Sequence, residues 1–543
     1  MINLKKGTLN LTLKDPGFVG LLAKLVKKNT FIILGVILLV ISVASFCVFL
    51  ANGLGLSYND ARSHLDIGRR VVEGLKPGLA QLGSVWLPLP HILMIPTVWN
   101  DFMWHTGLSG AIQSMLSFIA TGVIIFYYLK RLNVGLLGRV VALLIFIANI
   151  NILYMQSTAM TELLLIATMT AAAYELLLWF YDEKLLSLIK ASFWVMAASL
   201  IRYDGWFLFL MMAAIITAYT YKKLGFKAAE ARLLFFSTVG ALGIALWFLW
   251  NLLIFKDPLY FIYGPYAAYT QQLQLAEAGN LATKGNLLFS LKVYFFALSY
   301  NSNIFFLLLG GFGAALFYMD RKIKAGIKLA TTALLAPLVF NIIALYLGQS
   351  VLFIQGLSGN TWFNVRYGLV LMPAITIFIG YLIGRAGRMK YALFGLILMV
   401  AFFGFVNYDA VTIDDARVGS SQKNVSEVSG WLSTNTKGKD GFVLISAASH
   451  DAIIFSSGLP MSKFIHEGTG SYWLAATSAP DRWARWIIMR THDRNDLTFK
   501  LIEANAGLKK YNLVGHYPFA DIYELDAKYL GTLNTKPSLG KQK

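Results

Sequence analysis

Long apolar runs constrain this chain more than any other feature of its sequence. Each is roughly 16 to 22 residues long, close to the roughly 20 residues that a helix needs to cross the hydrocarbon core of a bilayer. The runs lie near 31–51, 108–129, 137–155, 160–181, 187–203, 206–221, 233–254, 304–318, 329–347, 364–384 and 391–407. The sequence therefore predicts a mainly α-helical protein, a polytopic transmembrane bundle of about eleven helices.

Composition supports lipid as the solvent. The 543 residues are 57% hydrophobic and 14% charged, against about a quarter charged in a soluble domain. The net charge of +19 does not indicate nucleic-acid binding, because the basic residues form short clusters between apolar runs. The single cysteine, Cys47, lies in the first run, which excludes an intrachain disulfide or a cysteine metal site. That run is expected to be a retained helix, not a cleaved signal peptide.

The basic clusters predict which end of each helix faces the cytoplasm. Six lysines precede the first run: Lys5, Lys6, Lys14, Lys24, Lys27 and Lys28. Every second loop after it is also basic, with Lys130, Arg131 and Arg139; Lys184 and Lys190; Lys222, Lys223, Lys227 and Arg232; Arg321, Lys322, Lys324 and Lys328; Arg385, Arg388 and Lys390. The positive-inside rule then predicts a cytoplasmic N-terminus and an extracytoplasmic C-terminus, in a plasma or inner membrane.

Two domains are expected, a transmembrane domain over 1–407 and a small soluble extracytoplasmic α/β domain over 408–543. In the second, strands are predicted and expected to be buried, and helical stretches alternate with them. The strands are Phe442–Ser446, Trp486–Arg490 and Tyr511–Val514, and the helices lie near Ser471–Trp483 and Asp496–Ala504.

Two long outer segments are predicted between the spans. The segment 52–107 has two amphipathic stretches, Asp60–Leu75 and Pro88–Trp104. It also contains Trp86, Trp99 and Trp104, which are suited to the membrane interface. The second segment, 255–303, is rich in Tyr, Gln and Asn.

Ionisable residues at the outer ends of the predicted helices are the candidates for function, because a charge there costs several kcal/mol unless it is paired or used. On the predicted topology all of them face one compartment and can converge on one cavity. They are Asp60, Arg62, His64, Asp66, Glu162, Arg202, Asp204 and Arg366, with Tyr367 beside the last.

Each candidate has a structural interpretation beside the chemical one. Asp60 can cap a helix on which His64 shares its face at i,i+4 spacing, or it can act as a general base. Glu162 can pair with Arg202 across the bundle, and Arg202 can form an ion pair at the tight turn that follows it. Arg366 is placed at a helix start, where the helix end favours anions, so it can help to bind a phosphate.

The ordered set of short motifs resembles that of the GT-C membrane glycosyltransferases, closest to the branch of protein O-mannosyltransferases and aminoarabinose transferases. The motifs are Tyr58–His64, Trp86–His91, Met160–Glu162, Leu200–Tyr203 and Asn364–Tyr367. The resemblance covers the membrane part, about three-quarters of the chain. One departure is that Asn59 precedes Asp60 where many relatives carry two adjacent acidic residues. This departure leaves the acceptor open and weakens the case for a divalent metal.

The resemblance implies transfer of a hexose or pentose from a polyprenyl-phosphate donor to an acceptor outside the cytoplasm, with inversion. Asp60 would be the general base, and Arg366, with Arg202 as second candidate, would bind the donor phosphate. Further substrate contacts would come from Arg62, His64, Glu162, Tyr367 and Trp86. The acceptor would be a protein, a lipid or a glycan, and membrane lipids the only other partners, with no cofactor and no nucleic acid.

Two other classes of function stay open on the residues alone. A transporter or flippase of lipid-linked glycans would place its polar residues near the bilayer midplane and break helices there. A non-catalytic assembly protein would tolerate replacement of Asp60. The sequence has no P-loop, no dinucleotide-binding glycine motif and no zincin motif, and neither His450-Asp451 nor His466-Glu467 has the spacing of metal ligands.

Overall fold

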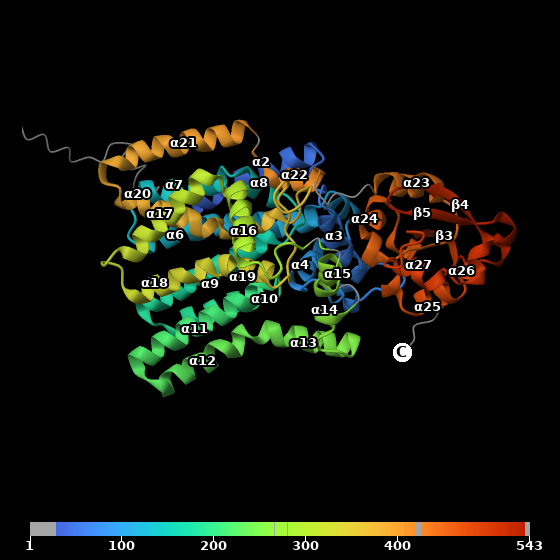
Figure 1. Cartoon of the computed structure of the whole chain (residues 1–543), viewed down its shortest axis with the longest axis horizontal. Coiled ribbons are helices and arrows are strands. Elements are labelled where there is room, and N and C mark those ends of the chain that lie inside the picture. Colours follow the sequence, from blue (N-terminus) through green and yellow to red (C-terminus); the bar gives the residue numbers. More distant parts are fainter. Residues whose placement is uncertain are drawn as a thin grey trace, which may run out of the picture.

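The computed structural model describes residues 29–264, 267–277, 279, 281–407, 409–418 and 425–537. A bundle of long helices forms the larger part of the molecule, and a smaller α/β part follows at one end of it (Figure 1). The lysines that precede the first run lie outside the described residues. The predicted fold class, a helical membrane bundle with a small C-terminal α/β part, is confirmed.

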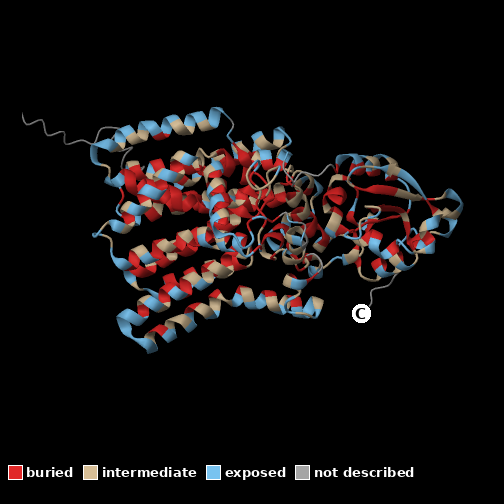
Figure 2. Ribbon diagram, viewed as in Figure 1, coloured by how far each residue is buried: buried red, intermediate tan, exposed pale blue. Residues whose placement is uncertain are grey.

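The buried centre of the bundle contains α6 (Leu108–Arg131), α9 (Glu162–Asp182) and α20 (Met372–Arg385) (Figure 2). Small residues let these helices approach closely, as is usual in membranes. A Cβ added at Gly138, on α7 (Leu136–Ile147), would lie 2.5 Å from the carbonyl oxygen of Gly380 on α20.

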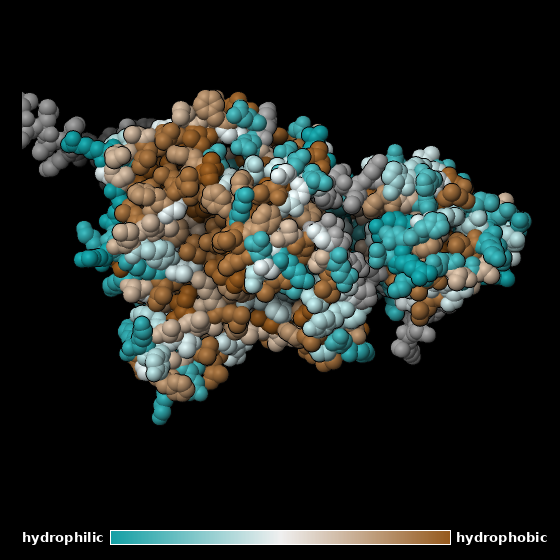
Figure 3. All heavy atoms as spheres, viewed as in Figure 1, coloured by the Kyte–Doolittle hydropathy of each residue, from teal (hydrophilic) through white to brown (hydrophobic). Residues whose placement is uncertain are grey.

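Helices at the margin of the bundle expose apolar side chains. Examples are α2 (Thr30–Ala51), α12 (Phe226–Gly240), α13 (Leu242–Phe255) and α21 (Lys390–Val406). Brown, apolar side chains cover much of the bundle surface, whereas the C-terminal part is largely teal (Figure 3). Water would penalise so large an apolar surface, so hydrocarbon is its solvent.

In the described part of the chain, seven helices are long and apolar enough to span a membrane, or up to nine when each of two bent pairs counts as one span. The apolar helices α7 and α10 (Leu185–Ser199) are shorter and match two further predicted runs. The protein is therefore a multi-pass membrane protein.

The structure breaks the predicted run 137–155 into α7 and α8 (Ile150–Met155). Asn149 causes the break, since its side chain caps α8 by accepting a hydrogen bond from the backbone N–H of Ile152.

The prediction also missed α16 (Leu287–Ser302), inside the outer segment 255–303. It meets α17 (Ile304–Met319) at 107°, and Asn303, with φ +70°, forms the corner. Polar Tyr and Asn residues near the C-terminal end of α16 hid its apolar character.

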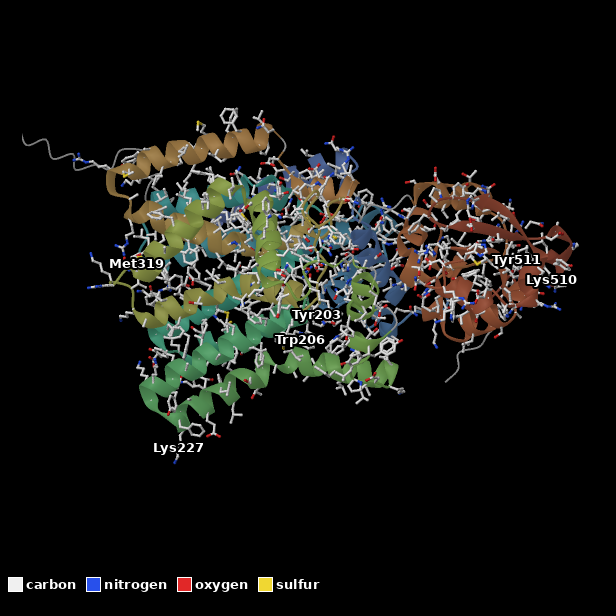
Figure 4. The ribbon with its side chains drawn as sticks, in the orientation of Figure 1. Tyr203, Trp206, Lys227, Met319, Lys510 and Tyr511 are labelled. Atoms are coloured by element: carbon white, nitrogen blue, oxygen red, sulfur yellow. The ribbon has the colours of Figure 1, made fainter. Side chains whose placement is uncertain are left out.

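The basic loops lie together at the end of the bundle away from the C-terminal part. Tyr181 donates to the carbonyl of Arg131, Glu183 pairs with Lys223, and Arg385 lies 2.9 Å from Asp320. Lys227 and Met319 mark this end (Figure 4). The charges thus segregate as the positive-inside rule requires, while the compartment that this end faces stays a prediction.

The outer segment 52–107 folds into α3 (Asn59–Val72), η1 (Leu79–Leu82), α4 (Leu89–Val98) and α5 (Asp101–His105). Of its tryptophans, Trp99 is exposed, but the interfacial prediction for Trp104 is wrong. Trp104 is fully buried, because Phe455 of the C-terminal part packs edge-on against it.

A five-stranded sheet of order β2-β1-β3-β5-β4 forms the C-terminal part. β1 pairs in parallel with β2 and β3, and β5 pairs antiparallel with β3 and β4. The strands are β1 (Phe442–Leu444), β2 (Phe464–Ile465), β3 (Ala484–Met489), β4 (Tyr511–His516) and β5 (Asp521–Leu525). The expectation that Tyr511–Val514 is buried is wrong beyond Tyr511, because β4 is an edge strand that exposes Leu513 and Val514.

The remaining α-helices complete the described structure. They are α11 (Asp204–Leu224), α14 (Tyr260–Tyr263), α15 (Ala268–Glu277), α18 (Ala325–Thr332), α19 (Ala336–Tyr346), α22 (Val411–Val418), α23 (Ser426–Thr436), α24 (Ala447–Ser456), α25 (Ser471–Ser478), α26 (Pro480–Trp483) and α27 (Leu497–Ile502). The predicted helix Ser471–Trp483 is thus divided in two, because Pro480 begins a new turn.

Candidate active site

Arg366 gathers three carboxylates at the end of the bundle nearest the C-terminal part. Its Nη2 lies 2.6 Å from Asp60 Oδ2, its Nε 2.9 Å from Glu162 Oε1, and its Nη1 3.7 Å from Asp415 Oδ2. Arg366 lies in η3 (Val365–Leu371), a 3₁₀ turn that opens the helical stretch continued by α20. The predicted site residues Asp60, Glu162 and Arg366 are therefore in direct contact.

Glu162 joins Arg366 to the second arginine. Its Oε1 also accepts a hydrogen bond from Arg202 Nη1 at 3.0 Å, and Arg202 Nε lies 3.4 Å from Asp204 Oδ2. The predicted ion pairs of Arg202 with Glu162 and within its own turn are both confirmed. We call the six residues Asp60, Glu162, Arg202, Asp204, Arg366 and Asp415 the ionic cluster.

Helix N-termini offset the excess of acid in the ionic cluster, which holds four carboxylates and two guanidinium groups. Glu162 is the first residue of α9, Asp204 the first of α11, and Asp60 the second of α3. A carboxylate in the first turn is stabilised by the unpaired N–H groups and the helix dipole. Asp60 is not the cap itself, because α3 begins at Asn59 and Tyr58 holds the N-cap position without a side-chain cap.

Two tyrosine rings line the arginines. The Arg366 guanidinium carbon lies 4.9 Å from the centre of the Tyr58 ring, and that of Arg202 lies 4.4 Å from the Tyr367 ring. The Tyr58 hydroxyl lies 3.1 Å from Asp415 Oδ2 and 2.9 Å from the carbonyl oxygen of Thr412, and its single proton is shared between these two acceptors. Burial, and next the Asp415 charge, raise the pKa of Tyr58 well above its ordinary value, so the phenol remains a donor.

The side chains of the ionic cluster differ in how far they are exposed. The side chain of Asp60 is 37% exposed and that of Arg202 19%, whereas Arg366 is 3% exposed and Glu162 fully buried. A reactant arriving from outside therefore meets Asp60 and Arg202. Arg366 and Glu162 hold those two groups in place from behind.

Backbone packing and buried amides fix this arrangement. Asn301 donates to the carbonyl of Val365, the residue before Arg366, at 2.7 Å. Asn151 accepts hydrogen bonds from the N–H and the hydroxyl of Thr412, which anchors α22. Gly368 lets η3 approach α16, since a Cβ there would lie 2.6 Å from the carbonyl oxygen of Ala297.

The other predicted substrate contacts lie around this centre. His64 contacts His91 and Trp86, with its Nδ1 2.8 Å from His91 Nε2 and its ring beside that of Trp86. Burial, helped by the charges of Arg366 and Arg202, lowers the pKa of His64 to about 3, so it is neutral at pH 7 and does not hold an anion by charge. Arg62 donates to the carbonyl of Leu56 at 2.9 Å.

Sequence reasoning missed Asp415 and the role of Tyr58. Asp415 follows the last apolar run and was counted with the soluble domain, although α22 packs against α8, η3 and α16. No local motif marks it, because its partners Tyr58 and Arg366 come from distant parts of the chain. Within the described ranges no group of three or more His, Cys, Asp or Glu side chains is arranged to hold a metal ion.

Comparison with known proteins identifies solved structures with a similar fold. No model of a known protein family matches the sequence, and no curated protein matches it significantly. Among solved structures, ArnT from Cupriavidus metallidurans bound to undecaprenyl phosphate matches 90% of this chain and 98% of its own, with a TM-score of 0.54 and 11% identity. The apo structure of the same protein gives 0.50 over the same shares, with 10% identity.

A third structure is less similar. The archaeal oligosaccharyltransferase AglB from Archaeoglobus fulgidus, in complex with an inhibitory peptide and a dolichol-phosphate, has a TM-score of 0.42 and 10% identity, over 93% of this chain and 75% of that one. The chain therefore shares the fold of ArnT, which agrees with the predicted resemblance at the level of the fold.

Proposed function

We propose that the protein is a glycosyltransferase that moves a sugar from a polyprenyl-phosphate carrier to an acceptor hydroxyl on the extracytoplasmic face. The fold shared with ArnT, which was solved with undecaprenyl phosphate, supports the donor class. The observation that carries the proposal is the contact of the half-exposed Asp60 with the buried Arg366. A charged pair so placed at a bundle end is costly to keep unless it is used.

Asp60 acts as the general base in this proposal. Its exposed carboxylate takes the proton of the acceptor hydroxyl while that oxygen attacks the anomeric carbon of the donor sugar. The bond from the anomeric carbon to the phosphate oxygen breaks in the same displacement, so the configuration inverts. Arg366 orients the carboxylate, because its guanidinium is fixed by Glu162 and by the packing of η3.

Arg202 is the better placed of the two arginines for the donor phosphate. It is the more exposed one, and the leaving polyprenyl phosphate gains negative charge as the bond breaks, which a nearby guanidinium stabilises strongly in a site of low dielectric. Arg366 would contribute its charge from behind Asp60. Tyr367, Trp86, Arg62 and His64 form the surroundings of the sugar and the acceptor, and the buried Glu162 contributes by holding the two arginines. No step of this proposal uses a metal ion.

We also propose that the protein lies across the membrane in the predicted orientation. The C-terminal part, 408–543, and the ionic cluster face the extracytoplasmic side, and the basic loops and the N-terminus of 1–407 face the cytoplasm. A flippase is disfavoured, because the ionic cluster lies at one end of the bundle while such proteins place their polar groups at the midplane.

The test is a panel of radiolabelled polyprenyl-phosphate hexoses and pentoses incubated with the purified protein and with candidate protein, lipid and glycan acceptors. Release of polyprenyl phosphate together with a labelled acceptor supports the transferase. Movement of an intact lipid-linked glycan across proteoliposomes, without cleavage, would instead support a flippase. Neither activity, with the bundle stably folded, would favour an assembly protein.

A further inference from the structure

Helix α3 carries Asp60 in its first turn and is tied to the C-terminal part by its last turn. Arg70 Nη1 lies 2.6 Å from Asp451 Oδ1 on α24, and the two side chains are only 10% and 11% exposed. Helices α3 and α24 lie side by side where the two parts of the molecule meet (Figure 1). A buried ion pair therefore spans the contact between the helix of the proposed base and the C-terminal part.

A second buried carboxyl group lies near this ion pair. Asp66 lies one turn before Arg70 on α3 and is fully buried, and its carboxyl group interacts electrostatically with Asp451 and Arg70. No hydrogen bond within the described residues satisfies either of its carboxyl oxygens. Two buried carboxylates against one guanidinium repel each other unless one holds a proton. We call Asp66, Arg70 and Asp451 the seam triad.

Further contacts join the same two surfaces. Glu73, which follows α3, accepts a hydrogen bond from the N–H of Met461 at 2.9 Å, and Gln81 donates to the carbonyl of Gly468 at 2.7 Å. On the other side of α24, His450 lies 2.6 Å from Asp496, the cap of α27. Helix α24 is thus fixed to the rest of the C-terminal part, and its position determines where α3 rests.

We propose that the seam triad is a proton-dependent latch: with one of its two carboxyl groups protonated it holds the C-terminal part on α3 and thereby positions Asp60 for transfer. The positioning role rests on the proposed function, whereas the latch itself does not. Asp66, Arg70 and Asp451 act through α3 and are positioning residues, since none of them touches the ionic cluster in the described contacts.

Other charged and titratable groups lie on the elements packed around the triad. They are Arg69 and Glu73 beside α3's last turn, His64 on α3, His91 on α4, Asp101 and His105 on α5, Glu427 on α23, His450 on α24, and His466 and Glu467 beside α24. Burial lowers the pKa of His466 and His64 to about 3 and that of His91 and His105 below the ordinary value. Glu467 accepts the N–H groups of Ala447 and Ala448 at the start of α24.

The direction of the pH effect follows from the triad. Burial raises the pKa of Asp451 to about 6 against the opposing charge of Arg70, and burial and the Asp451 charge raise that of Asp66 well above its ordinary value. The seam triad therefore binds more protons when the C-terminal part rests on α3 than when the two separate, at pH values above about 4, the ordinary aspartate pKa. Contact between α3 and the C-terminal part is thus favoured at low pH and weakens as the pH rises through these raised pKa values.

Amide hydrogen exchange of the full-length protein in nanodiscs tests the latch without any assay of activity. In the wild type, the protection of α3 and α24, corrected for the intrinsic exchange rate, is expected to fall about tenfold or more from pH 6 to pH 8. The variant Asp66→Asn, which keeps the shape of the protonated acid, should lose most of this dependence. Asp481→Asn is the matched control, because Asp481 pairs with Lys510 elsewhere in the C-terminal part, and it should follow the wild type.

Turnover as a function of pH tests the positioning role. Asp66→Asn should keep the kcat of the wild type at pH 6 and extend it to higher pH, with the KM for the donor unchanged. Arg70→Met should lower kcat at every pH. If Asp66→Asn and the wild type show the same pH dependence of protection, the latch is refuted, whatever the activity. If protection behaves as expected but no transfer is found with any donor, the proposed function fails and the latch stands.

Discussion

Arg366 Nη2 and Asp60 Oδ2 lie 2.6 Å apart, although the two residues are separated by 306 positions in the chain. The pair is asymmetric, since Asp60 is 37% exposed while Arg366 is 3% exposed. The buried guanidinium holds the reachable carboxylate, and the rest of the ionic cluster holds the guanidinium.

Removal of Arg202 should weaken binding of the carrier more than it weakens the fold. Charge-assisted hydrogen bonds to a phosphate are worth about 1.5–3 kcal/mol each, so Arg202→Ala should raise the Kd for polyprenyl phosphate about 10- to 100-fold. Arg232→Ala, at the opposite end of the bundle, should leave that Kd unchanged. Equal losses in both variants, measured by titration in nanodiscs, would contradict the phosphate assignment.

Glu162 should be a residue on which stability depends. Its Oε1 separates the Arg202 and Arg366 guanidinium groups, and Glu162→Ala leaves the buried Arg366 and the partly exposed Arg202 facing each other without the carboxylate between them. Breaking such a site costs about 3–5 kcal/mol. Denaturation in mild detergent should reveal the loss, with the exposed Glu230→Ala within about 0.5 kcal/mol of the wild type. A Glu162→Ala protein as stable as the control would disprove the role of this side chain in holding the arginines.

Gly368 tests whether the position of η3 matters for transfer. Gly368→Ala places a Cβ 2.6 Å from the backbone oxygen of Ala297 and 2.8 Å from its carbonyl carbon, which pushes η3 and Arg366 away from α16 without changing any charge. Turnover should fall about tenfold or more, because small misplacements of catalytic groups are costly. Gly395→Ala is the control, since nothing lies within 4 Å of its added Cβ. Identical turnover in the two variants would show that η3 tolerates the shift.

Tyr58→Phe should lower turnover but preserve the shape of the pH profile. The single phenol proton is shared between Asp415 and the Thr412 carbonyl, and leaving a buried acceptor without its donor costs about 1–3 kcal/mol. The pKa of Tyr58 is raised well above its ordinary value, so the hydroxyl does not ionise below pH 10. Loss of an alkaline limb from the profile of the variant would mean that the phenol titrates after all.

Apolar length and charge spacing predict much of this molecule. They identify the bundle, the end at which the basic loops gather, and the presence of Asp60, Glu162, Arg202 and Arg366 at the other end, because membranes impose strong local rules on sequence. The sequence does not predict the contacts of Asp415 and Tyr58, or the ion pair between Arg70 and Asp451. They depend on contacts between distant segments, and a buried polar residue in a soluble stretch carries no periodic signal.

The breaks in the bundle were equally hard to predict. Asn149 and Asn303 divide apolar stretches by capping helices with their side chains, an effect that a hydropathy window averages away. The same averaging hid α16. These local polar interactions decide where η3 and α22 rest, and therefore the geometry of the ionic cluster.

The central claim is that Asp60 removes the proton of the acceptor in sugar transfer. The direct measurement is the single-turnover rate of Asp60→Asn at saturating donor, once a productive donor and acceptor are known, with exposed Asp440→Asn as control. The account predicts a fall of about 10²- to 10⁴-fold, with polyprenyl phosphate bound as tightly as by the wild type. Transfer by Asp60→Asn at the rate of the wild type would contradict it.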